Sequence, residues 1–212
     1  MCRLLHIRSE SEFEIQSYLE KFAKTSKDSK EFQGHGWGVS FLENGEWKHY
    51  RNIIPVWEDD LSQFGKTNLL IAHARSAFKD EGIAVENNMP FYDDRYVFVF
   101  NGELRGVKIN SEGRIGAEKI FNYIKRFDKG NMYEAISRGT EIIKKKTSYI
   151  RAMNIIMCDK KDSYVYSLFN EDPDYFTMRS MEGAEGTLVI SSVKLDENHV
   201  WKGIENESLL KF

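Results

Sequence analysis

The sequence predicts a mixed α+β domain in which two sheets pack face to face between layers of helix. Strand-like segments recur through the first half of the chain, two amphipathic segments occupy its middle, and strand-like segments return after them. This order is what two face-packed sheets covered by helices would produce. The chain has no repeat, no low-complexity tract and no linker, so residues 1–212 are expected to form one domain.

The first half of the chain contains one predicted helix among several predicted strands. A strand-like run follows Cys2, and residues 11–24 then have apolar side chains close to helical spacing, which predicts a helix. Asn44-Gly45 predicts a tight hairpin between two strands. Residues 79–89 have no clear period and are predicted to be a loop. The predicted strands are residues 37–42, 47–50, 68–72 and 96–100.

The second half begins with two predicted helices, residues 117–127 and 132–146, which Gly130 separates. Three lysines at 144–146 suit the negative end of a helix dipole. Strands are predicted after the helices, at residues 152–158, 164–169, 176–179 and 187–191.

Composition narrows the classes of function. The net charge is −3 and basic residues are dispersed among acidic ones, so we expect neither a nucleic-acid nor an anionic-membrane partner. The apolar runs are far shorter than the ~20 residues that span a bilayer, and no signal peptide is recognisable. Two cysteines, Cys2 and Cys158, without a CxxC pair suggest a reducing, cytoplasmic setting. The histidines have no metal-ligand spacing, so no metal or cofactor is expected.

Cys2 is the leading candidate for a nucleophile. If Met1 is removed, Cys2 carries a free α-amine beside its thiol. A thiol with a reference pKa of about 8.5 needs a base to attack well, and an α-amine that titrates near 8 can accept its proton. The alternative is a small apolar residue on a buried strand.

Four further motifs follow Cys2 along the chain. They are Gly34-His35-Gly36-Trp37-Gly38, His73-Ala74-Arg75, Asn87-Asn88-Met89-Pro90-Phe91 and Asn101-Gly102-Glu103-Leu104. In this order and spacing, the set resembles the class II glutamine amidotransferases, which are N-terminal-nucleophile hydrolases, and most closely their short single-domain members. The motifs cover residues 2–120 approximately. The resemblance implies a four-layer αββα sandwich and hydrolysis of the side-chain amide of glutamine without a cofactor.

The resemblance also implies roles for individual residues. Cys2 would be the nucleophile, and the Asn101 side chain with the Gly102 N–H would form the oxyanion hole that amide cleavage needs. Arg75 would hold the α-carboxylate of glutamine through its planar fork of donors. Trp37 would form a wall of the pocket, and His73 would be a half-buried structural residue. The simpler alternatives are an Asn-Gly turn, a surface ion pair of Arg75 and a core position for Trp37.

Four positions depart from the family pattern. Gly116 replaces the aspartate that binds the α-amino group of glutamine, and Phe78, Met89 and Phe100 replace the usual polar residues. Because a buried ammonium without a carboxylate is costly, either Glu118 or Glu112 takes this role, or the substrate is not free glutamine.

Three functions therefore remain open. The first is glutamine hydrolysis that supplies ammonia to a separate synthase subunit. The second is hydrolysis of a γ-glutamyl or related amide in a larger conjugate. The third is a non-catalytic domain that binds a partner.

Overall fold

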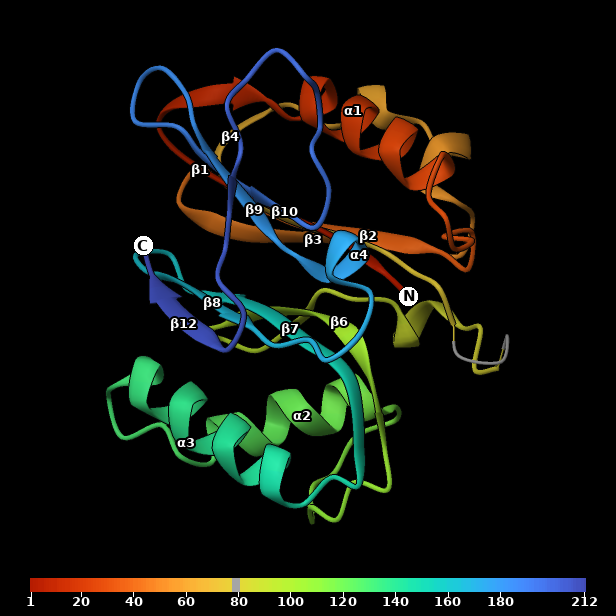
Figure 1. Cartoon of the computed structure of the whole chain (residues 1–212). Coiled ribbons are helices and arrows are strands. Elements are labelled where there is room, and N and C mark those ends of the chain that lie inside the picture. Colours follow the sequence, from red (N-terminus) through yellow and green to blue (C-terminus); the bar gives the residue numbers. More distant parts are fainter. Residues whose placement is uncertain (78–80) are drawn as a thin grey trace.

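A computed structural model describes residues 1–77 and 81–212. Within these residues the strands form two antiparallel sheets, one of seven strands in the order β11-β9-β10-β1-β4-β2-β3 and one of five in the order β12-β8-β7-β6-β5. Figure 1 shows the sheets face to face, with α1 on the outer side of the larger sheet and α2 and α3 on the outer side of the smaller one. This is the αββα layer order expected above.

The elements have the following bounds. The seven-stranded sheet contains β1 (Arg3–Glu14), β2 (Trp37–Glu43), β3 (Glu46–Asn52), β4 (Lys66–Ala74), β9 (Arg179–Glu182), β10 (Leu188–Ser191) and β11 (Lys202–Gly203). The five-stranded sheet contains β5 (Phe91–Tyr92), β6 (Val97–Arg105), β7 (Tyr149–Cys158), β8 (Ser163–Ser167) and β12 (Ser208–Lys211). The helices are α1 (Ile15–Lys27), α2 (Gly116–Lys125), α3 (Met132–Lys145) and α4 (Pro173–Phe176), with short 3-10 turns η1 (Val56–Glu58), η2 (Leu61–Gln63) and η4 (Val85–Asn87).

Alternation along β1 divides the hydrophobic core in two. Leu5 and Ile7 pack with Ile15, Leu19 and Phe22 of α1. Leu4, the residue before Leu5, belongs instead to the core that the smaller sheet shares with α2 and α3. Successive side chains of a strand point to opposite faces, so β1 connects both cores. Each of these fully buried side chains contributes about 1.5–3 kcal/mol through removal from water.

Local signals predicted several elements correctly. Asn44 and Gly45 both have positive φ, 52° and 76°, as a tight hairpin between β2 and β3 requires. The helices α2 and α3 lie where the apolar spacing indicated. Cys158 is a fully buried thiol at the end of β7, as expected.

Three predictions about elements were wrong. The helix predicted at residues 11–24 begins only at Ile15. The first strand extends further than expected, because after a bulge β1 pairs with β4 again at Phe13 and Glu14. The segment predicted as a strand from 176 begins instead with the end of α4. The strand predicted at residues 96–100 does not end before Asn101, because β6 continues to Arg105 in pairing with β7.

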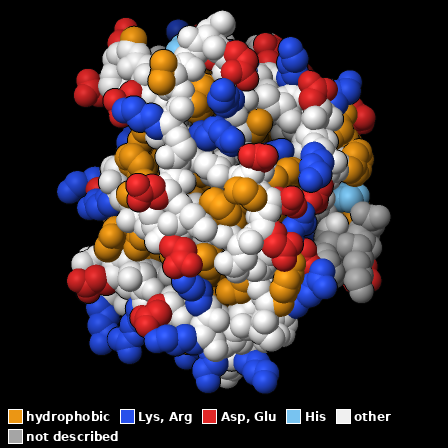
Figure 2. All heavy atoms as spheres, in the orientation of Figure 1, with side chains coloured by type: hydrophobic (Ala, Val, Ile, Leu, Met, Phe, Trp, Pro, Cys, Tyr) orange, Lys and Arg blue, Asp and Glu red, His pale blue; other side chains and the backbone are white. Residues whose placement is uncertain are grey.

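The charged side chains of both signs are dispersed over the surface. Figure 2 shows acidic and basic side chains mixed over one face of the molecule. Among residues 1–77 and 81–212, no helix is long and apolar enough to cross a membrane.

Candidate active site

Cys2 lies immediately before β1 and is nine-tenths buried. Its Sγ accepts a hydrogen bond from the backbone N–H of Ser76 at 3.4 Å, just beyond the end of the neighbouring strand β4. Burial raises the pKa of this thiol, and the smaller opposing effects of the N-terminal ammonium, the Ser76 N–H and Arg75 do not cancel it. A thiol in this environment depends on a neighbouring base to become a nucleophile.

Arg75 follows β4 directly and is only 5% exposed. Its Nη1 donates to Asn88 Oδ1 at 3.2 Å and its Nη2 donates to the carbonyl of Gly82 at 2.9 Å. Within residues 1–77 and 81–212 no carboxylate pairs with this guanidinium. Arg75 is therefore a buried cation beside Cys2 that retains free N–H donors, and it is not the surface ion pair that was the alternative expectation.

Asn101 occupies a fully buried position in β6, where β7 places Asn154 directly opposite. Phe98, an odd number of residues away on β6, stacks on Phe121 of α2. Because side chains alternate along a strand, Asn101 points the other way, towards the seven-stranded sheet. β6 packs directly against β1 and β4 of that sheet.

The hydrogen bonding of the two facing asparagines differs sharply. Asn154 donates to the Phe176 carbonyl at 2.7 Å and accepts from the Leu168 N–H at 3.2 Å. Neither the oxygen nor the nitrogen of the Asn101 amide has a partner in the described part of the chain. An unpaired buried amide costs about 1–3 kcal/mol, and a catalytic role is one of the explanations for such a group.

Gly102 has a structural reason to be glycine. A Cβ at this position would lie 2.1 Å from the carbonyl oxygen of Ala152 on β7. The close approach that glycine permits here is therefore to the neighbouring strand, and the residue adds no independent sign of a substrate.

His73 is more deeply buried than expected. His73 is fully buried between the sheets, where the expectation was a half-buried residue, and burial followed by the charge of Arg75 lowers its pKa to about 3, against the opposing effect of the Phe100 carbonyl. The imidazole is therefore neutral near pH 7 and touches the strand that carries Asn101.

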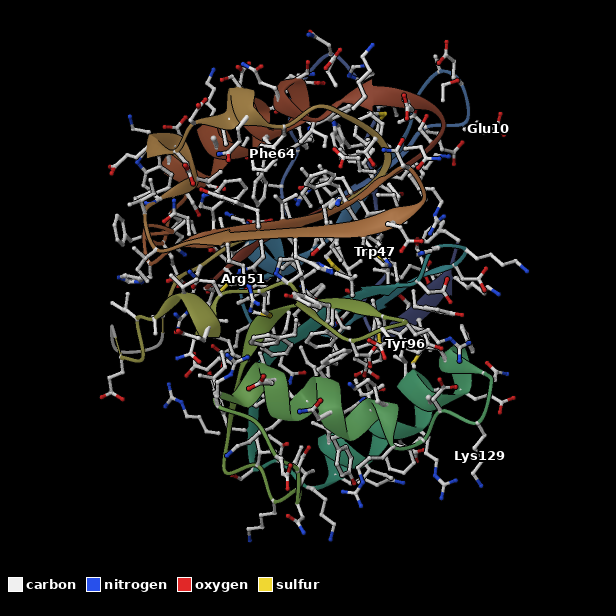
Figure 3. All side chains as sticks on the ribbon, turned by 180° about the vertical axis from the view of Figure 1, so that it is seen from behind. Glu10, Trp47, Arg51, Phe64, Tyr96 and Lys129 are labelled. Atoms are coloured by element: carbon white, nitrogen blue, oxygen red, sulfur yellow. The ribbon has the colours of Figure 1, made fainter. Side chains whose placement is uncertain are left out.

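Trp37 lies on the outer face of the seven-stranded sheet, where it packs on Tyr50 and Phe64 and its Nε1 donates to Asp59 at 2.8 Å. Figure 3 shows Phe64 on the α1 side of this sheet, with Arg51 on the other side, between the sheets. The predicted role of Trp37 as a pocket wall beside Cys2 was wrong, because alternation along β2 turns its side chain into the outer core.

The positions that depart from the family pattern also have clear surroundings. Gly116 begins α2 and is exposed, and a Cβ added there would meet no atom within 4 Å. Glu118 is held by Arg114, whose Nε lies 3.0 Å from Oε2, and Glu112 is exposed. Met89 and Phe100 are buried, whereas Phe78 lies outside the described residues.

Sequence reasoning missed several polar residues at this site. Asn88 joins Arg75 to β3, because its Nδ2 donates to the Asn52 carbonyl and its own carbonyl accepts from Arg51. Gln33 and Tyr175 both contact the backbone at Met1. No local motif marks Tyr175, and Asn88 could have been found only by its place within the Asn-x-x-Pro-Phe segment.

The fold of this chain is similar to that of several solved structures. No family model matches the sequence, and no curated protein matches it either. Among solved structures, the glutamine phosphoribosylpyrophosphate amidotransferase of Bacillus subtilis superposes over 99% of this chain with a TM-score of 0.71 and 14% identity. This chain spans 47% of that protein.

Two shorter structures match over nearly their whole length. A glutamine aminotransferase class-II domain protein from Silicibacter pomeroyi has a TM-score of 0.63 and 16% identity, and the match covers 99% of this chain and 94% of that one. A predicted glutamine amidotransferase from Pseudomonas aeruginosa has a TM-score of 0.62 and 15% identity, with coverage of 100% and 97%. From Met1 to Phe212, this chain has the fold of the class II glutamine amidotransferase domains.

Proposed function

We propose that residues 1–212 form one amidohydrolase domain that uses Cys2, after removal of Met1, to hydrolyse the side-chain amide of glutamine to glutamate and ammonia. The observation that carries this proposal is the buried amide of Asn101, which has no hydrogen-bond partner among residues 1–77 and 81–212 and points towards the sheet that holds Cys2. A preorganised donor without a protein partner is what a developing oxyanion requires.

The residues support the following sequence of steps. The α-amine of Cys2 takes the proton of the thiol, and Sγ attacks the amide carbonyl of the substrate. The oxyanion accepts hydrogen bonds from the Asn101 side chain and the Gly102 N–H. The α-amine returns its proton to the leaving nitrogen as the C–N bond breaks, so ammonia departs and a thioester remains on Cys2. Water then hydrolyses the thioester and releases glutamate.

Arg75 supplies the recognition of the substrate. A buried guanidinium with free donors and no described carboxylate partner is suited to bind an anionic group such as the α-carboxylate of glutamine. We propose further that the released ammonia passes to a separate synthase subunit.

One observation favours a second substrate class. Glu118, the acid that could replace the missing aspartate, is bound by Arg114 through both Nε and Nη2, and its pKa is lowered chiefly by that pairing. An α-ammonium therefore competes with Arg114 for this carboxylate. A γ-glutamyl amide in a larger conjugate would avoid this competition only where its α-amine is also acylated.

Thiol labelling tests the nucleophile. A glutamine-like diazo-ketone should label Cys2 of Met-free chains, as peptide mapping would detect, and should label Cys158 little, because burial raises the pKa of Cys158 to about 12. Cys2→Ala should abolish both labelling and ammonia release, and Cys158→Ser should preserve both. Equal labelling of the two cysteines, or hydrolysis by the Cys2→Ala protein, would reject Cys2 as the nucleophile.

A further inference from the structure

Two buried side chains converge on the backbone beside Cys2. The carbonyl oxygen of Met1 accepts a hydrogen bond from Gln33 Nε2 at 2.6 Å and another from the Tyr175 hydroxyl at 2.5 Å. Gln33 is fully buried and Tyr175 is 6% exposed. These residues come from the segment before β2 and from α4, so the tertiary fold alone brings them together at this peptide group.

The same peptide group contains the nitrogen of Cys2. The oxygen and nitrogen of one peptide unit lie about 2.3 Å apart, so the amide nitrogen of Gln33 lies within about 5 Å of the Cys2 nitrogen. Once Met1 is removed, its carbonyl no longer occupies the donors of Gln33 and Tyr175, and the Cys2 nitrogen becomes the free α-amine at this position.

The Gln33 amide is already held in place on one side. Its Nε2 also lies 2.7 Å from the Glu31 carbonyl, 3.2 Å from the Tyr175 hydroxyl and 3.4 Å from the Ser29 hydroxyl, so its two hydrogens are shared among these oxygens and the Met1 carbonyl. Its Oε1 is buried and has no hydrogen-bond partner in the described part of the chain. Because Oε1 and Nε2 belong to one amide group, this unused acceptor lies within about 7 Å of the Cys2 nitrogen.

We propose that Gln33 is a positioning residue for the general base, and that its amide oxygen accepts a hydrogen bond from the α-amine of mature Cys2, directly or through one water. This inference rests on the proposed function, in which that amine is the base. The hydrogen bond directs the amine's remaining lone pair towards Sγ, and Tyr175 holds the orientation of the Gln33 amide.

The neutrality of Gln33 matters as much as its position. A carboxylate at this place would favour the protonated amine and so remove the base at neutral pH. The charged groups around the site are Glu31, Arg3, Arg75 and Arg151, with the Tyr175 hydroxyl among them. The one acid of this set, Glu31, pairs with the N-terminal ammonium of Met1 and with Arg151 Nη1, the latter at 3.2 Å, and Arg3 lies 4.0 Å above the Tyr175 ring. Three arginines therefore surround one acid at this site, and a second acid at position 33 would weaken that excess of positive charge.

The test is the pH dependence of Cys2 alkylation by iodoacetamide in Met-free protein. Gln33→Glu should raise the midpoint of the alkylation profile by about one pH unit or more, because an opposite charge nearby stabilises the ammonium. Ammonia release at pH 7 should fall roughly tenfold, in line with that shift, and should recover at higher pH. Gln63→Glu, which adds the same charge at an exposed glutamine, should leave the midpoint unchanged.

A second variant covers the case in which Gln33→Glu does not fold. Gln33→Met keeps a similar volume but removes the acceptor, so it should lower the alkylation rate at least several-fold while the circular dichroism spectrum stays native. An unchanged midpoint in folded Gln33→Glu, or an unchanged rate in Gln33→Met, would overturn the role of Gln33.

The alkylation readout needs no substrate, so it separates this inference from the proposed function. If Cys2→Ala retains hydrolysis, the proposed function fails, and the role of Gln33 in the reaction fails with it. If Cys2→Ala is inactive but the midpoint of the alkylation profile is the same in wild type and Gln33→Glu, only the inference about Gln33 fails.

Discussion

Asn101 and Asn154 show how one residue type serves two purposes on adjacent strands. They are paired in register and both are fully buried. Asn154 connects β7 to the ends of α4 and β8 through two hydrogen bonds, so it is part of the scaffold. Asn101 makes no such bond among the described residues, so its amide contributes a cost and no structural gain. The difference between the two amides can be measured.

We expect Asn101→Ala to lower kcat by about 10²–10³, because an oxyanion donor acts mainly in the transition state. The same substitution removes no hydrogen bond of the described residues and relieves an unpaired buried amide, so the free energy of unfolding should not fall by more than about 1 kcal/mol. Asn154→Ala is the matched control and should lose about 2–4 kcal/mol, because it leaves a carbonyl and an N–H unpaired. Ammonia release and urea denaturation measure the two effects. Equal destabilisation by both substitutions, with kcat unchanged in Asn101→Ala, would make Asn101 a scaffold residue.

The beginning of α2 is the element on which the substrate question depends. Gly116 is its first residue, and Ile115 before it makes no side-chain capping bond. Several interactions connect this end of the helix to Asn88. Arg114 lies over the Phe91 ring at 5.7 Å. The charge of Arg51 helps to lower the pKa of Glu118, and Arg51 Nη1 donates a hydrogen bond to the Asn88 carbonyl. Asn88 in turn accepts from Arg75. This series of interactions leads from the beginning of α2 to Arg75, the residue proposed to bind the substrate.

Gly116→Asp should have two separate effects. The side chain meets open space and lies at the positive end of the helix dipole, so α2 should gain about 0.3–1 kcal/mol. If glutamine is the substrate, a carboxylate for its α-ammonium should lower KM about tenfold or more, which corresponds to roughly 1–3 kcal/mol. Wild-type KM should lie well above the usual range of about 1 μM–1 mM.

Ammonia release against glutamine concentration, with thermal unfolding of the same proteins, separates the two effects of Gly116→Asp. Glu112→Gln changes an exposed acid of the preceding loop and serves as the control. Efficient wild-type turnover with no gain in Gly116→Asp would mean that another acid already binds the amine. A stabilised variant without turnover of glutamine would favour the conjugate as substrate.

At the scale of the whole molecule, packing two sheets together buries histidines that cannot be charged. His6 on β1 and His73 on β4 are both fully buried, and burial first, then a nearby arginine, lowers the pKa of each to about 3. An unfolded histidine titrates near 6.5. Between these values the unfolded chain binds protons that the folded chain does not, so stability is present above pH 6.5 and is lost as pH falls below it.

We therefore expect the free energy of unfolding to fall by about 2–3 kcal/mol between pH 7 and pH 5.5 through His6 and His73, with a smaller share from the half-buried His49, whose pKa is lowered to about 4 by burial and Arg51. Urea denaturation at both pH values measures this loss. His6→Gln should reduce the loss by about 1 kcal/mol, because one of the two fully buried imidazoles is removed. A pH dependence that is the same in wild type and His6→Gln would show that the histidines do not drive the acid instability.

The sequence by itself determined the local elements and the set of chemical groups. Asn44-Gly45 specified a hairpin, because few residues tolerate positive φ at both positions. The apolar spacing specified α2 and α3. The motifs around Cys2, Arg75 and Asn101 indicated the fold that the solved structures share with this chain.

Only the tertiary structure decided how those groups face one another. Alternation shows that Trp37 and Gly38 lie on opposite faces of β2, but which face meets the second sheet depends on pairing with distant strands. The absence of a described partner for Asn101 and the meeting of Gln33 with Tyr175 also follow from segments far apart in the chain. Hydrogen bonds and burial at a site are properties of such long-range contacts, and no local pattern of residues encodes them.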